Sequence, residues 1–302
     1  MAAASTDGAH EELRPLMFSI AYRMTGSVGD AEDIVQEAFI RAYRAEEAGT
    51  QVESPQAFLA TTTTRLAIDH LRLARVRRES YVGTWLPEPL VAEPGPAERA
   101  EMADSLSLAF LVLLESLSPV ERAVFLLREV FGYEYGEVAR TVGKSEPNCR
   151  QIFARARRRI DEGRPRFEAS RRQGAELTDR FLTVVGGGDI DAFIDMLAPD
   201  VVLFGDGGGK GQALPAPIYG RERVARLLRG LGRRAQQLAV AARPVQVNGQ
   251  PGLVSFDQDG KVVAVMAFDV LDGQVQVIRS IVNPDKLRHL GETSEAFLRP
   301  DR

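Results

Sequence analysis

A helix-turn-helix pattern between residues 117 and 160 constrains the fold of this chain most strongly. A first helix is followed by a short helix over residues 135–142, a tight turn at 143–145 and a long basic helix. Ser145 is a favourable N-cap and Pro147 is tolerated only in a first turn, so the long helix must start here. Apolar residues at helical spacing predict a buried stripe on it: Cys149, Ile152, Phe153, Ala156 and Ile160.

The other side of this long helix is polar and basic. When the apolar stripe is buried, four residues stay exposed: Arg150, Gln151, Arg155 and Arg158. Such a helix fits the major groove of duplex DNA. A helical hairpin with a solvated basic face is the plainer alternative, but the glycine-bearing turn, the short preceding helix and the arginine cluster together favour DNA binding.

Composition agrees with a local basic surface. The 302 residues suffice for two or three separate cores, and we expect three domains. The net charge is -4, yet nine arginines lie between residues 150 and 172, so positive charge is concentrated at the long helix. The single cysteine, Cys149, excludes an intramolecular disulfide. The sequence shows no leader and no apolar run of membrane-spanning length, so we expect a cytoplasmic protein without a membrane segment.

Three amphipathic helices are predicted before the helix-turn-helix. The first covers residues 13–24, and glycines at 26 and 29 interrupt the pattern. Asp30 is the expected N-cap of the second helix, and the third begins after Pro55. The third helix ends in a basic tail suited to phosphates: Arg72, Arg75, Arg77 and Arg78.

Two of these stretches resemble a known family. GDAEDIVQEAFIRAYR, at residues 29–44, is similar to region 2 of the extracytoplasmic-function sigma factors of bacterial RNA polymerase, and the helix-turn-helix is similar to their region 4. The resemblance implies that the chain binds promoter DNA and core RNA polymerase, at the β′ clamp helices and the β flap. It also implies that the polar face of the second helix contacts the clamp helices through Asp33, Gln36 and Glu37.

The same resemblance implies which residues read DNA. At the duplex -35 element, Arg150, Gln151, Ala154 and Arg155 are expected to read bases, and Arg158 is expected to contact phosphates. Arginine can fork onto guanine, glutamine onto adenine, and alanine can touch a thymine methyl group. The resemblance also implies that the loop over residues 46–55 and the start of the next helix take up the single-stranded -10 element. The contacts that we expect there are Phe58, Arg65, Arg72 and Arg75. Many family members read W-L-x-x-I-A-x-N where this chain has FLATTTTR, so Arg65 stands where an asparagine is usual.

The linker between the two helical regions carries one tryptophan. As a plain polar linker it would tuck Trp85 against a neighbouring helix. However, WLPEP at residues 85–89, DGGGK at 206–210 and NPDKL at 283–287 resemble motifs of the sigma-J-like subgroup, which has a fused C-terminal SnoaL-like domain. Opposite charges and an aromatic anchor in these pentapeptides predict a regulatory interface. Its expected members are Trp85, Pro87, Asp206, Lys210, Asn283, Asp285 and Lys286.

The sequence becomes apolar and glycine-rich after residue 172. Helices are predicted over residues 175–185, 190–197 and 221–231, and strands over 239–247, 253–256, 262–270 and 275–282. Asn-Gly and Asp-Gly pairs between the strands are strong hairpin signals. We therefore expect an α+β cone with a curved antiparallel sheet, as the SnoaL-like resemblance also implies.

The predicted chain is multidomain, with two all-α sigma domains followed by this α+β SnoaL-like cone. The expected boundaries are 10–80 for region 2, 81–104 for the linker, 105–165 for region 4 and 174–291 for the SnoaL-like regulatory domain.

Promoter-specific transcription initiation, regulated by the C-terminal domain, is the preferred function. Two alternatives remain: a ligand-sensing helix-turn-helix repressor or activator, and an isomerase-like or hydrolase-like enzyme fused to a DNA-binding module. No histidine falls in a predicted strand and no paired carboxylates stand out, so we expect no catalysis, no metal and no cofactor. A hollow cone leaves room for a small ligand, which the sequence does not identify.

Overall fold

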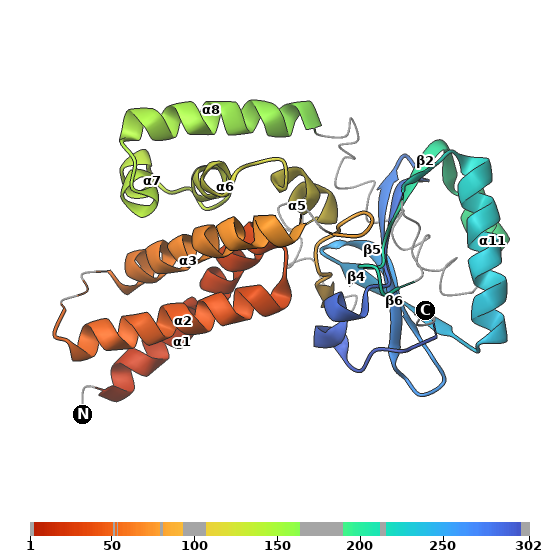
Figure 1. The fold of residues 1–302 in the computed structure, drawn as a ribbon, viewed down its shortest axis with the longest axis horizontal. Coiled ribbons are helices and arrows are strands. Elements are labelled where there is room, and N and C mark those ends of the chain that lie inside the picture. The colour runs from red at the N-terminus through yellow and green to blue at the C-terminus, as the bar shows by residue number, and fades with distance from the viewer. Residues whose placement is uncertain are drawn as a thin grey trace. The chain divides into compact units, whose positions relative to one another are not determined.

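The computed structural model describes residues 3–50, 52, 54–78, 81–92, 107–163, 190–211 and 216–296 (Figure 1). The chain forms two compact units, and each unit is built from two separate stretches. The helical unit comprises Met1–Ser80 and Leu111–Arg164, and the sheet unit comprises Tyr81–Phe110 and Pro165–Arg302. The linker with its tryptophan thus belongs to the sheet unit.

Three helices form the first part of the helical unit: α1 (Ala3–Thr25), α2 (Val28–Glu47) and α3 (Pro55–Arg78). Ser27 caps α2, because its hydroxyl accepts a hydrogen bond from the backbone nitrogen of Asp30 at 3.2 Å. The prediction that Asp30 is the N-cap was wrong, since the helix begins two residues earlier and Asp30 lies in its first turn. The three helices enclose a core that includes Met17, Ile20, Val35, Leu59 and Ala67.

The helix-turn-helix follows as predicted. The elements are α5 (Leu108–Leu114), α6 (Pro119–Phe125), the π-helical turn η3 (Leu126–Val130), α7 (Tyr135–Val142) and α8 (Glu146–Gly163). Gly143 ends α7 in the left-handed conformation, with φ of 65°, where glycine carries no steric penalty. The next helix, α8, begins directly after Ser145 with Pro147 in its first turn, which confirms the expected start.

The sheet unit combines a seven-stranded sheet with helices. Its helices are α10 (Ile190–Asp195) and α11 (Arg221–Gln237), with short 3-10 turns η4 (Pro284–Lys286) and η5 (Arg288–Leu290). Its strands are β1 (Val91–Ala92), β2 (Leu197–Asp206), β3 (Ile218–Tyr219), β4 (Ala241–Val247), β5 (Gln250–Phe256), β6 (Val262–Leu271) and β7 (Gln274–Ile281).

The sheet is mixed rather than purely antiparallel. Its strand order is β1-β4-β5-β6-β7-β2-β3, and among the described strands only the β2–β7 pair is parallel. The expected meander from β4 to β7 is confirmed. Asn248-Gly249 and Asp272-Gly273 all have positive φ, as two-residue hairpins of this hand require. Strands β1, β2 and β3 were not predicted, and the expected helix over 175–185 lies outside the described residues.

One face of the sheet packs against α10 and α11, and α11 runs alongside the sheet (Figure 1). Phe193 of α10 meets Phe268 of β6 edge-on, with ring centroids 5.4 Å apart. Leu203 of β2 belongs to this core. Asp206 is three residues further along the same strand, so its side chain points to the opposite face of the sheet.

Candidate functional site

The recognition helix α8 buries one side and exposes the other. Cys149, Ile152, Ala156 and Ile160 are buried, as the sequence predicted. Phe153 completes the stripe, with its ring stacked on Phe125 at 6.0 Å. The predicted -35 residues lie together on the exposed side: Arg150, Gln151, Ala154, Arg155 and Arg158. The helix thus exposes these five side chains along one surface, as the predicted -35 contact requires.

Arg150 is held in place before any DNA arrives. Its Nη2 atom lies 3.0 Å from a carboxylate oxygen of Glu146, one turn earlier, and its guanidinium lies 4.4 Å from the ring centroid of Tyr135. A planar guanidinium that stacks on an aromatic ring keeps its edge free for hydrogen bonds. This arrangement suits a side chain that must meet a base edge in one orientation.

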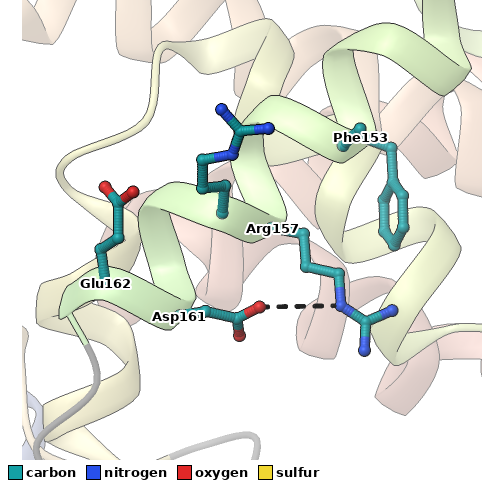
Figure 2. Close-up of a pocket in the computed structure, with 6 residues that line it drawn as sticks. Phe153, Arg157, Asp161 and Glu162 are labelled. Atoms are coloured by element: carbon teal, nitrogen blue, oxygen red, sulfur yellow. Dashed lines mark ion pairs between the residues drawn. The ribbon is translucent and has the colours of Figure 1, made fainter.

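An open hollow of about 550 Å³ runs along α8 beside these residues. It is lined by Phe153, Ala154, Arg157, Arg158, Asp161 and Glu162 (Figure 2). Figure 2 shows Arg157 directed toward Asp161, and their nearest N and O atoms are 3.9 Å apart. Arg157 also lies 3.8 Å from Glu129, whereas Arg158 forms no ion pair with any residue that the structure describes. Arg158 is therefore the better placed of the two for a phosphate.

The predicted polymerase-binding residues lie on the outer face of α2. Asp33 and Gln36 are exposed, and Glu37 is half-buried. Glu37 forms an ion pair with Arg41, one turn later, and its Oε1 atom lies 2.8 Å from Nε of Arg41. The three side chains stand opposite the buried face of the same helix and form one polar, acidic surface.

The predicted -10 residues are spaced along α3 at Phe58, Arg65, Arg72 and Arg75. Seven-residue steps place the first three on one side of the helix. Phe58 is half-buried, and Arg72 pairs with Asp69 at 3.0 Å. Arg65 donates hydrogen bonds to two backbone carbonyls of α7. The side chain of Arg75 lies outside the described residues.

The third group of predicted residues meets on the sheet unit around Asp206. This carboxylate has no exposed surface. Its Oδ2 atom accepts a hydrogen bond from the backbone nitrogen of Leu86 at 2.8 Å and lies 2.7 Å from Nζ of Lys286. Its Oδ1 atom accepts a hydrogen bond from the hydroxyl of Tyr81. A buried carboxylate is tolerated when it is paired and hydrogen-bonded in this way.

Lys286 is the second charged residue that holds the linker on the sheet unit. Its side chain is 9% exposed, and Nζ also donates a hydrogen bond to the backbone carbonyl of Leu86. The ammonium lies 4.4 Å from the ring centroid of Trp85 and 4.9 Å from that of Tyr81. Two aromatic faces, a carboxylate and a carbonyl therefore surround one buried cation. We call Tyr81, Trp85, Leu86, Asp206, Asn283 and Lys286 the linker site.

The parallel pair of strands brings two of the three pentapeptides together, those at residues 206–210 and 283–287. Asp206 ends β2 beside Ile281, the last residue of β7, and the chain then turns at Asn283. Asn283 accepts a hydrogen bond from the backbone of Asp285 at 3.1 Å and donates one to the Tyr81 hydroxyl at 3.0 Å. The left-handed Gly208 leaves room for it, since a Cβ there would lie 2.2 Å from Nδ2 of Asn283.

The other three members of the predicted set lie beside the linker site. Lys210 and Asp285 form an exposed pair at 2.6 Å, and Pro87 is buried in the linker. The pairing is thus Asp206 with Lys286 and Lys210 with Asp285. Asp206 is the last residue of β2.

Further along, the linker pairs with the sheet edge, which the sequence did not indicate. Leu90 exchanges two hydrogen bonds with Asn248, at 2.9 and 2.8 Å, and β1 then pairs with β4. His289 contacts the backbone carbonyl of Pro89 at 2.8 Å. Sequence reasoning missed the contacts of Tyr81, Asn248 and His289, because each is a lone polar residue far from its partner along the chain.

The described residues show neither a membrane span nor a metal site. None of their helices has both the length and the apolar character that crossing a bilayer requires. Within the same residues, His, Cys, Asp and Glu side chains do not gather in groups of three or more that could hold a metal ion.

Three family models match the chain in succession. Sigma-70 region 2 matches residues 9–77, Sigma-70, region 4 matches residues 107–160, and the SnoaL-like domain matches residues 178–281. Their order agrees with the two helical regions and the sheet unit described above.

Curated relatives and a solved structure match nearly the whole chain. It is 36% identical over 294 residues to the ECF RNA polymerase sigma factor SigJ of Mycobacterium tuberculosis, covering 91% of each protein. It is 34% identical over 278 residues to the probable ECF RNA polymerase sigma factor SigI of the same species, covering 91% of this chain and 92% of that one. The crystal structure of SigJ superposes with a TM-score of 0.71 at 33% identity, covering 93% of this chain and 98% of that chain.

Proposed function

The chain belongs to the extracytoplasmic-function sigma factors of RNA polymerase, and on this premise we propose that its sheet unit regulates initiation by holding the linker between the two DNA-reading regions. As a sigma factor, the chain binds core RNA polymerase and promoter DNA and directs promoter-specific transcription initiation. The regulatory step is carried by one observation: the linker is fixed on the sheet unit by the buried Asp206–Lys286 pair.

The linker site supports regulation because the linker joins the two regions that must engage the promoter. Leu86 contributes both its backbone nitrogen and its carbonyl to the buried pair, so releasing the linker leaves two charges without these partners. Tethering makes this contact intramolecular, with an effective concentration on the order of millimolar. A held linker therefore limits where region 4 can go relative to region 2.

We assign the roles of the exposed residues on the same premise. Arg150, Gln151, Ala154 and Arg155 read the -35 duplex, and Arg158 contacts its phosphates. Asp33, Gln36 and Glu37 bind the β′ clamp helices, while the β flap is the expected partner of region 4. Phe58, Arg65, Arg72 and Arg75 contact the -10 single strand. The protein acts in the cytoplasm, where core polymerase works.

The sheet unit is regulatory rather than catalytic in this proposal. Its buried charged pair on the face opposite α11 holds the linker, which leaves no separate reactive role for Asp206 or Lys286. The boundaries 10–80, 81–104, 105–165 and 174–291 remain the proposed domain limits. In the structure, the sheet unit contains the linker together with the SnoaL-like domain.

Run-off transcription with purified core polymerase tests the proposal. Lys286→Met removes the cation while keeping an apolar side chain of similar length, and it should raise transcription by loosening the linker, with core binding unchanged. Lys210→Met, in the exposed neighbouring pair, is the matched control and should behave as wild type. A folded Lys286→Met protein with wild-type transcription would remove the regulatory role of the linker site.

A further inference from the structure

Two arginines connect region 2 to region 4 inside the helical unit, and each binds the carboxyl end of a helix in the other region. Arg65 of α3 binds the end of α7, and Arg122 of α6 binds the end of α1. We infer that these contacts, with the Thr61–Thr141 pair, form a clasp that closes region 4 over the -10 face of region 2 and must open before initiation. The inference rests on the proposed role of α3 at the -10 element.

Arg65 satisfies the end of α7 with two donors. Its Nη2 atom donates to the carbonyl of Arg140 at 2.7 Å, and Nε donates to the carbonyl of Thr141 at 2.9 Å. The last carbonyls of a helix have no partner within the helix and carry its partial negative charge. A forked guanidinium matches both features, because it offers two parallel donors and a positive charge.

Arg122, in region 4, binds the end of a helix in region 2. Its Nη1 atom donates to the carbonyl of Met24, in the last turn of α1, at 2.6 Å, and lies 2.8 Å from Oε1 of Glu115. Arg122 is 3% exposed. Burial lowers the pKa of its guanidinium to about 9, which is still above neutral, so the group is charged at pH 7. The clasp therefore has one buried and one exposed connection.

The exposed connection is the one with which DNA competes. Arg65 stands in the middle of the proposed -10 stripe, between Phe58 and Arg72, and the edge of its guanidinium formed by Nε and Nη2 is occupied by α7. A DNA strand that binds this edge must take the place of the two helix carbonyls. A phosphate is an anion and binds a guanidinium more strongly than a neutral carbonyl does, so an arriving strand can replace α7.

In the closed form, the surfaces proposed for the -10 and -35 elements differ in their accessibility to DNA. In region 4, α7 contacts the half-buried Thr61 and occupies the Nε/Nη2 edge of the exposed Arg65, while the predicted base-reading face of α8 remains exposed. Opening the clasp is thus required for the -10 contact and not for exposure of the -35 surface. Because Arg65 exchanges the carbonyls of α7 for a DNA strand, α7 leaves as the single strand binds.

A reversible disulfide tests the clasp directly. The Oγ1 atoms of Thr61 and Thr141 are 3.1 Å apart, so Thr61→Cys with Thr141→Cys places two sulfurs within bonding reach. Oxidised glutathione takes two electrons and two protons from the thiols and leaves as two reduced glutathiones. The native Cys149 is buried, and burial raises the pKa of its thiol, so it reacts slowly.

We expect the disulfide to form readily and to lower run-off transcription at least tenfold, with full recovery in dithiothreitol. The single variants should keep wild-type transcription under the same oxidant. Failure of the disulfide to form in the folded protein, or equal transcription by the oxidised and reduced forms, overturns the inference. Ready disulfide formation with no transcription by wild type would instead overturn the proposed function and leave the closed form standing.

A third substitution in the double-cysteine protein isolates the part played by Arg65. Arg65→Ala should slow disulfide formation severalfold, because the clasp then closes less often. Arg72→Ala, on the same side of α3 but paired with Asp69, is the matched control and should leave the rate unchanged. Equal rates for all three proteins would show that Arg65 does not hold the regions together. Mass spectrometry of the trapped protein reports the rate without any transcription assay.

Discussion

Nζ of Lys286 lies 2.7 Å from Oδ2 of Asp206, and neither side chain is more than 9% exposed. Removing one partner of such a pair leaves a buried charge without compensation, which typically costs about 3–5 kcal/mol. Asp206→Asn or Lys286→Met should lower the stability of the sheet unit by that amount. The single tryptophan, Trp85, sits on the Lys286 ammonium, so its fluorescence in urea reports this unfolding.

The exposed pair beside it provides the comparison. Lys210→Met removes an ion pair whose partners are 57% and 40% exposed, and such pairs are worth under about 1 kcal/mol. If Lys210→Met shifts the urea midpoint as much as Lys286→Met does, the buried pair is not what fixes the linker.

Tyr81 should resist ionisation in the folded protein. Burial of its phenol, and then the charge and hydrogen bond of Asp206, raise its pKa above the ordinary range. The unfolded chain loses this proton at about pH 10, and the folded chain keeps it. Unfolding therefore releases a proton above about pH 10, and the stability of the sheet unit falls as the pH rises further.

Ultraviolet absorbance of tyrosinate measures this property. In the folded protein, Tyr81→Phe should leave the number of tyrosines that ionise by about pH 11 unchanged, because Tyr81 is still protonated there. Loss of one ionising tyrosine in the variant would show that the phenol is accessible. Trp85 fluorescence should be recorded in parallel to confirm that the sheet unit is folded at each pH.

Charge reversal on α2 should abolish polymerase binding without unfolding the protein. Asp33 is exposed and Glu37 is half-buried, so Asp33→Lys with Glu37→Lys should cost under about half a kcal/mol of stability per site. Asp200→Lys with Asp259→Lys, at two exposed positions of the sheet unit, is the matched control. Retention on immobilised core polymerase is the measurement. Wild-type retention of the folded α2 variant would exclude these residues from the contact.

The two arginines Arg150 and Arg158 should differ in how they affect DNA binding. Arg150→Ala should cost roughly 1–3 kcal/mol at one -35 position and relax base choice there. Arg158→Ala should weaken all sequences about equally and lower the salt slope by about one. Titrations against a set of single-base promoter variants at several salt concentrations separate the two. Uniform weakening by both would mean that the base-reading face has been misassigned.

Elements whose signals are local could be predicted from the sequence. The bounds of α7 and the start of α8 follow from Gly143, Ser145 and Pro147, which act within a few residues of where they stand. The hairpins between β4 and β7 follow from dipeptides that require positive φ. The buried face of α8 follows from helical spacing alone.

Elements that depend on distant partners could not be predicted. Strand β2 contains Pro199 and Gly205 and pairs in parallel with β7, so no hairpin signal marks it. The two-residue strand β1 exists only because β4 offers it an edge. The three pentapeptides did indicate which segments meet, but neither the Asp206–Lys286 pairing nor the contact of Arg65 with α7 could be read from spacing.

The sheet unit includes residues 81–110, a segment that lies in the sequence between the two parts of the helical unit. The sheet unit therefore cannot be added or removed by changing the sequence at a single position. A protein ending near residue 164 would keep residues 81–92 without the sheet residues that contact them, exposing side chains such as Leu86, which is 1% exposed in the intact chain. Such a protein would carry an exposed apolar segment in the middle of its sequence, which favours aggregation. Grafting the sheet unit onto another sigma factor would require transplanting two stretches of sequence together.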